Sequence, residues 1–144
     1  MSLNYVMLGS NDVPKARVFY DALLPVIGGE LIAEYMPHAF CYELRGGGRV
    51  WVATPFDRET AMAGNGNMVG LACASKAEVR AAHEMALAQG GMNEGDPGPR
   101  PRYGPDFYGA YCRDLDGNKM SFVFFDEGTA SWPERLIVLT LNVG

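Results

Sequence analysis

Residues 5–12 read YVMLGSND, and 63 positions later residues 68–75 read MVGLACAS. Each stretch begins with an apolar, strand-like run and ends on polar side chains suited to cap a helix. The same offset pairs Gly28 with Gly91, at the points where the two predicted helices stop. The chain is therefore predicted to contain two copies of one module, which must pack together to bury their apolar faces.

The first module is predicted over residues 3–56. Asn11 or Asp12 is expected to cap its helix, with Pro14 in the first helical turn, where a missing N–H is harmless. Apolar residues recur along this helix at spacings of three and four, so one stripe is predicted to pack on a sheet. The predicted elements are a strand over 3–9, a helix over about 13–25, and strands over 30–36, 39–45 and 49–54.

The second module is predicted over residues 67–125. Ser75 and Glu78 form a capping-box pattern at the start of a helix that runs to about Gln89. The stretch 92–106 contains four prolines, so we expect a long loop there with at most a short edge strand. The remaining predicted strands lie over 68–73, 108–112 and 119–125, the last two joined by a tight hairpin.

Composition limits the classes of function. The 144 residues, 48% of them apolar, suit a single domain over 1–144. A net charge of −5 without a basic run argues against nucleic acid as a partner. The N-terminus lacks an export signal and no stretch reaches membrane-spanning length, so we expect a cytoplasmic protein without membrane contact. The three cysteines, an odd number, indicate reduced thiols buried in strands.

The tail over 126–144 ends in an apolar run that has no counterpart in the first module. Such a run needs cover, so we expect an added strand or a subunit contact, and a homodimer.

The sequence resembles a known group of proteins at three places. These are residues 5–12, the following Phe19-Tyr20-Asp21, and above all residues 108–119, which read YGAYCRDLDGNK. The resemblance is to the glyoxalase/bleomycin resistance/extradiol dioxygenase group, the vicinal oxygen chelate superfamily. It implies an α+β fold in which two tandem βαβββ modules form, with their mixed sheets, a curved half-barrel cleft.

The resemblance also implies a divalent metal held by His and Glu side chains. The three matching positions here carry Tyr5, Met68 and Ser121. A phenol, a thioether and a hydroxyl are poor ligands for such a metal, so we expect no metal and no cofactor. Of the two histidines, His83 is expected outside the cleft and His38 in a surface turn, where a role in acid–base chemistry or recognition stays open.

A ligand site is predicted from strand alternation and from a loop rich in cations and aromatic residues. Arg102, if it points inward, could hold a carboxylate or phenolate, and Tyr103 could stack on a ring; a solvated loop charge is the alternative for the arginine. A core filled by Met68 is the alternative to a pocket. The predicted ligand-binding residues are Tyr5, Met7, Trp51, Met68, Arg102, Tyr103, Tyr108 and Ser121.

Three functions follow from these residues. The first is a metal-independent protein that binds a small planar or amphipathic organic molecule in the cleft, as drug-sequestering members of the group do. The second is a divergent lyase, isomerase or dioxygenase, for which no catalytic residue can be assigned; an unperturbed Tyr or Ser is a poor base at neutral pH. The third is an interaction module that pairs through its tail and sheet edges.

Overall fold

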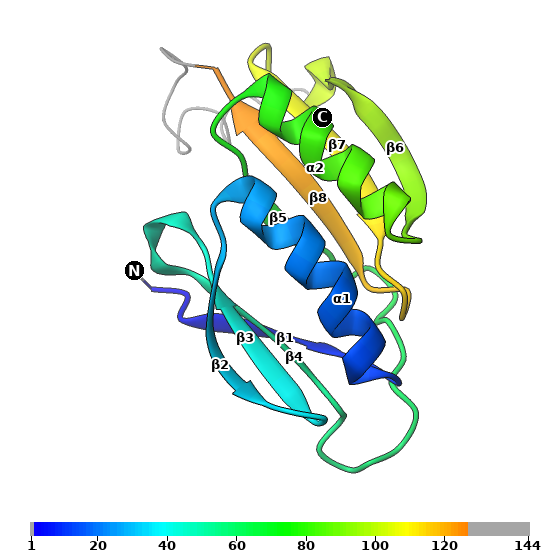
Figure 1. Ribbon diagram of the computed structural model, residues 1–144. Helices are drawn as coiled ribbons and strands as arrows, with labels where there is room; N and C mark the ends of the chain where they lie inside the picture. The colour runs from blue at the N-terminus through cyan, green and yellow to red at the C-terminus, as the bar shows by residue number, and fades with distance from the viewer. Residues whose placement is uncertain (1, 127–144) are drawn as a thin grey trace.

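The computed structural model describes residues 2–126 and divides them into two modules of the same design (Figure 1). The first contains β1 (Tyr5–Gly9), α1 (Val13–Leu23), η1 (Leu24–Ile27), β2 (Glu30–Tyr35), β3 (Ala39–Glu43), η2 (Arg45–Gly47) and β4 (Arg49–Ala53). The second contains β5 (Val69–Ala72), α2 (Lys76–Ala88), β6 (Met92–Pro99), η3 (Pro101–Tyr103), β7 (Phe107–Arg113) and β8 (Lys119–Phe125).

The two sheets have equivalent topologies. Their strand orders are β1-β4-β3-β2 and β5-β8-β7-β6. In each sheet the first pair, β1 with β4 or β5 with β8, is parallel, and the other pairs are antiparallel. The predicted α+β fold with two tandem βαβββ modules is therefore confirmed. The helices α1 and α2 lie side by side across the two sheets (Figure 1).

Helix α1 begins as predicted and ends earlier. The Asp12 side chain accepts a hydrogen bond from Lys15 N at 3.0 Å, which makes Asp12 the N-cap. The α-helix stops at Leu23 and continues as the 3-10 turn η1, because Pro25 has no N–H for the regular helical ladder. Gly28, at φ 81°, then ends the segment in the left-handed region.

Helix α2 has its N-cap at Ser75, which accepts from Glu78 N at 3.0 Å. Only this half of the predicted capping box forms, since the Glu78 carboxylate pairs with Arg45 Nη1 at 2.6 Å. The left-handed glycine at its end is Gly90, at φ 97°, and so the structural partner of Gly28 is Gly90 rather than Gly91.

The prediction of a long loop over 92–106 was wrong in its extent. β6 is an eight-residue edge strand that pairs with β7, followed by the short turn η3. The pairing shifts register between Asn93 and Gly95 and again between Gly95 and Gly98. An edge strand uses only one side of its backbone for pairing, so these irregularities accommodate Pro97 and Pro99 without breaking the sheet.

One hydrophobic core joins the two modules. Phe19, Leu23 and Ile27 of the first module are fully buried with Val79 and Phe122 of the second. The core therefore spans both modules and holds them in one arrangement.

The hairpin between β7 and β8 is hydrogen-bonded to the first module. Asp114 Oδ2 accepts from Tyr20 Oη at 2.5 Å, and Asn118 Nδ2 donates to Gly9 O at 3.0 Å. Asp116 Oδ1 accepts from Asn11 N at 2.8 Å. These contacts bring the end of β1 and the start of β8 together, which positions the candidate site.

Within residues 2–126, the helices are too short or too polar to cross a membrane. The predicted strand or subunit contact in the tail falls on residues 127–144, outside the described residues.

Candidate functional site

A pocket of about 460 Å³ opens between the two modules. It lies where β1 ends and where β5 and β8 begin. Three methionines, Met7, Met62 and Met68, contribute to its wall, with Asn118 and Lys119 from the start of β8. Its remaining lining comes from Leu8, Gly9, Val69 and the connector over 63–67.

The connector that forms one wall is tied to the first module. Asn11 Nδ2 donates to Ala61 O at 3.0 Å, and Ala61 N donates to Asn11 Oδ1 at 2.7 Å. A Cβ added to Gly9 would stand 3.1 Å from Ala61 Cβ, so the small residue at the end of β1 allows this close approach. The wall is therefore held by paired hydrogen bonds rather than by helix or strand geometry.

Two of the eight predicted ligand-binding residues, Met7 and Met68, line the pocket. They are 57% and 48% exposed, so Met68 does not plug a filled core. Val6 and Leu8 pack against the core, and alternation along β1 therefore puts Met7 and Tyr5 on the opposite face.

Trp51 and Ser121 lie on the pocket side of the sheets but outside the pocket lining. Trp51 is in register with Met7 across β1 and β4, and its ring stacks on Tyr35 with centroids 6.1 Å apart. Ser121 is 2% exposed and pairs in register with Gly70 on β5. A Cβ on Gly70 would stand 3.4 Å from Ser121 Oγ, so these two residues lie close together on neighbouring strands.

Arg102 and Tyr103 lie in η3, at the other end of the second sheet. The Tyr103 ring meets Phe107 edge-on with centroids 5.3 Å apart, and Arg102 Cζ lies 5.4 Å from the Tyr103 centroid. Neither residue lines the pocket.

Tyr108 is separated from the other predicted site residues. Its hydroxyl accepts from Arg80 Nη1 of α2 at 3.2 Å, and Lys76 Nζ lies 5.6 Å from its ring centroid. It packs against the core on the helix-covered face, since it has the same parity along β7 as the buried Ala110 and Cys112. Tyr108 therefore lies outside the candidate site.

Sequence reasoning missed ten of the twelve lining residues; those with long or polar side chains are Met62, Asn67, Asn118 and Lys119. A signal existed for Lys119, which precedes Ser121 by two positions and so shares its face of β8. No periodic pattern in the connector marked Met62 or Asn67, because irregular segments have no side-chain period.

No family model and no curated protein matches the sequence. A solved structure of a glyoxalase/bleomycin resistance protein from Albidiferax ferrireducens T118 is 34% identical, with a TM-score of 0.76, and the alignment covers 85% of this chain and 98% of that chain. The chain belongs to the glyoxalase/bleomycin resistance protein family. The predicted resemblance to the vicinal oxygen chelate superfamily is thereby confirmed.

More distant structures of the glyoxalase/bleomycin resistance group share the fold alone. A glyoxalase-related enzyme from Fulvimarina pelagi is 18% identical, with a TM-score of 0.69, covering 86% of this chain and 88% of that chain. A glyoxalase/bleomycin resistance protein/dioxygenase family enzyme from Burkholderia phytofirmans PsJN is 16% identical, with a TM-score of 0.65, covering 85% and 98%.

At the three positions that the resemblance matches to metal ligands, this member of the glyoxalase/bleomycin resistance family does not have side chains that fit the divalent metal implied by the superfamily. Tyr5, Met68 and Ser121 offer a phenol, a thioether and a hydroxyl, whereas such metals prefer imidazole and carboxylate ligands. Among residues 2–126, no three His, Cys, Asp or Glu side chains gather closely enough to hold a metal ion.

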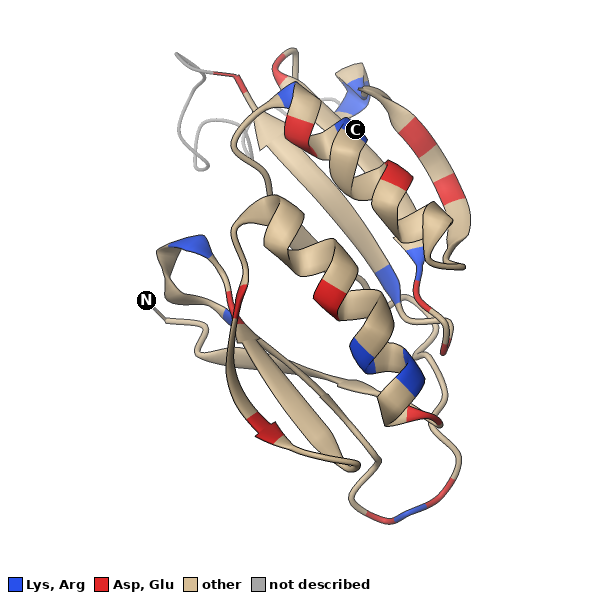
Figure 2. Cartoon of the chain, in the orientation of Figure 1, with Lys and Arg blue, Asp and Glu red and all other residues tan. Residues whose placement is uncertain are grey.

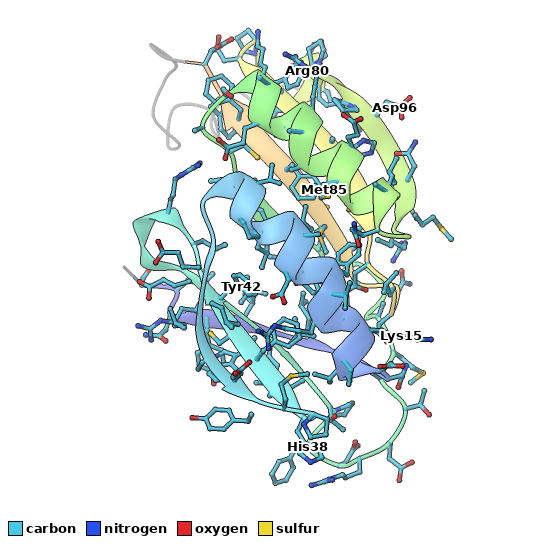
Figure 3. The ribbon with its side chains drawn as sticks, viewed as in Figure 1. Lys15, His38, Tyr42, Arg80, Met85 and Asp96 are labelled. Carbon is cyan, nitrogen blue, oxygen red and sulfur yellow. The ribbon has the colours of Figure 1, made fainter. Side chains whose placement is uncertain are left out.

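The two histidines lie away from the pocket. His83 is buried on α2, with Nε2 3.0 Å from Asn93 Oδ1, so it joins the helix to β6. His38 is exposed at the turn between β2 and β3 (Figure 3). The expectation that His83 lies outside the cleft agrees with this position.

The three cysteines are free and buried, as predicted. Burial raises the pKa of the Cys73 and Cys112 thiols to about 12 each, and it also raises the pKa of Cys41. Thiolates, which are the nucleophilic form, are therefore scarce near neutral pH.

We expect the folded protein to react slowly with Ellman's reagent at about pH 8, where a free cysteine reacts readily. In denaturant all three thiols should react within the mixing time, because unfolding removes the burial that raises their pKa values. One thiol that reacts rapidly in the folded state would contradict this result.

Proposed function

We propose that the protein binds a small planar or amphipathic organic molecule in the pocket between its modules, without a metal ion. The observation that supports this most directly is the lining, in which the half-exposed Met7 and Met68 face an open volume of about 460 Å³. Ligand pockets commonly measure about 300–1,000 Å³, and this volume lies within that range. Methionine is flexible and polarizable, which suits contact with planar rings.

A few polar groups at the pocket would orient the ligand. Asn67 and Asn118 contribute amides and Lys119 contributes an ammonium group to the lining. Polar groups at fixed positions in a pocket orient a ligand and give specificity. Asn118 already donates to Gly9 O at 3.0 Å, so its position is fixed before a ligand arrives.

Substitution of Met68 by tryptophan is expected to abolish ligand binding, since the larger ring fills the pocket. The measurement is a thermal shift with a panel of planar aromatic molecules and their carboxylates. A ligand at about ten times its Kd stabilises the wild type by about 1.4 kcal/mol, which raises Tm by about 4 °C. The Met68→Trp protein should show no shift with the same ligands.

Met92→Trp is the matched control, because Met92 is an exposed methionine at the start of β6 and does not line the pocket. It should keep the full thermal shift. Binding that survives in Met68→Trp would place the ligand elsewhere. A transition metal that remains at one per chain after dialysis would refute the metal-independent part of the proposal.

A further inference from the structure

The ring of Tyr111, on β7, has two cations close to it. Arg100 Cζ is 5.5 Å and Lys119 Nζ is 5.9 Å from its centroid. Its neighbours Ala110 and Cys112 are fully buried in the core, so strand alternation puts the Tyr111 side chain on the opposite face. Lys119 also lines the pocket between the modules. These three residues, named here the Tyr111 cluster, therefore meet the pocket at Lys119, whereas Arg100 and Tyr111 lie outside its lining.

The backbone of β6 holds Arg100 in place. The guanidinium donates to Asp96 O at 2.7 Å and to Pro99 O at 3.2 Å, two of its five possible N–H donations. Two glycines make room for it: a Cβ on Gly95 would stand 3.3 Å from Arg100 Nη2, and one on Gly98 would stand 3.2 Å from Nη1. The remaining N–H groups are thus held in a fixed orientation.

The two cations of the Tyr111 cluster are not paired with carboxylates of the described residues. Within the described part of the chain, neither Arg100 nor Lys119 forms an ion pair with a carboxylate. Two carboxylates of β6 have other partners: Glu94 accepts from Arg113 Nε at 2.7 Å, and Asp96 accepts from a nearby asparagine at 2.8 Å. Figure 2 shows basic positions at the start of β8 and in the turn after β6.

We propose that Arg100 and Lys119 form an anion-binding subsite of the pocket, and that the ligand is an aromatic or amphipathic carboxylate. This inference rests on the proposed function, because Lys119 connects the cluster to the pocket. A carboxylate between the guanidinium and the ammonium group would accept charge-assisted hydrogen bonds. The Tyr111 ring would contact the apolar part of the same molecule.

The test compares two probes of similar shape and different charge, 1-naphthoate and 1-naphthamide, by isothermal titration calorimetry. The wild type is expected to bind the carboxylate about tenfold more tightly, since hydrogen bonds to charged groups are stronger than neutral ones. R100Q and K119Q should each remove most of this preference, with a larger loss of affinity for the carboxylate than for the amide. The preference should also fall between about 0.05 M and about 0.5 M NaCl, because salt screens charges.

Tyr108 supplies matched controls on the opposite face of β7. Lys76 Nζ and Arg80 Cζ lie 5.6 and 6.0 Å from its ring centroid, much as the two cations lie about Tyr111. K76Q and R80Q therefore remove the same charges beside a tyrosine ring on the helix-covered side, where Lys76 also pairs with Asp126 Oδ2 at 3.2 Å; Arg80 is labelled in Figure 3. Both variants should keep the tenfold preference.

Two results would overturn the anion subsite. One is equal affinity of the wild type for both probes, and the other is an equal loss of preference in K76Q or R80Q. If both probes bind equally and Met68→Trp still blocks them, the proposed function stands and only the subsite is refuted. If neither probe binds while other panel molecules do, the subsite alone is again refuted. If no molecule of the panel binds, the proposed function fails as well.

Discussion

Replacement of Asp114 by alanine is expected to lower the free energy of unfolding by about 3–5 kcal/mol, because it removes a buried carboxylate that several donors share. Asp114 is 6% exposed. It accepts from Tyr20 Oη at 2.5 Å, from Asp116 N and Asn118 N at 2.9 Å each, and from Asn118 Nδ2 at 2.9 Å. The substitution leaves the buried Tyr20 hydroxyl without its acceptor.

The measurement is urea unfolding of the Asp114→Ala protein beside Tyr20→Phe. The second variant removes one hydrogen bond and leaves Asp114 its three other donors, so we expect a loss of only about 1 kcal/mol. In the double variant the loss should be less than the sum, since no hydroxyl is left unpaired. Equal losses in the two single variants would mean that Asp114 does not organise the hairpin.

Substitution of Gly91 by alanine is expected to lower the free energy of unfolding by about 2–3 kcal/mol, because the added methyl group meets backbone atoms that cannot move aside. Its Cβ would stand 2.7 Å from Ala86 O and 2.9 Å from Arg113 O. It would also stand 3.2 Å from Phe19 Cε2 of the first module. The cost therefore includes a disturbance of the contact between the modules.

Gly48→Ala is the control for this substitution. No atom lies within 4 Å of a Cβ at Gly48, and its backbone, at φ −67° and ψ 147°, suits any residue. Alanine there should be neutral or stabilise by about 0.5 kcal/mol, because it restricts the unfolded chain. Urea unfolding that gave similar losses at both positions would contradict the steric explanation for Gly91.

Local patterns were enough to predict most of the fold. Asp12 and Ser75 cap their helices as their side chains suggested, since an N-cap depends only on residues a few positions away. The two β-rich modules followed from apolar runs separated by turn residues. β6 was less predictable, because an edge strand tolerates prolines that a central strand does not.

The candidate site was predicted less well than the fold. The two methionines that line the pocket and the tyrosine that lies outside it show why. Met68 was found because it is one of the three positions that the resemblance matches to metal ligands, and Met7 because strand alternation places it on the same face as Tyr5. Tyr108 was assigned to the site from its neighbours in the chain, yet strand parity puts it on the helix-covered face beside Arg80. A one-residue difference along a strand reverses the face, so proximity in sequence is a poor guide there.

By itself, the sequence determined the duplicated module, the family, and the residue types Tyr5, Met68 and Ser121 at the positions that the resemblance matches to metal ligands. These depend on residue types and on short-range spacing. Only the tertiary structure decided that Lys119 joins the pocket to Arg100 and Tyr111, and that the connector after Ala61 forms a wall. Those contacts join segments far apart in the chain, such as Gly9 and Asn118, and their distances depend on how the two modules pack.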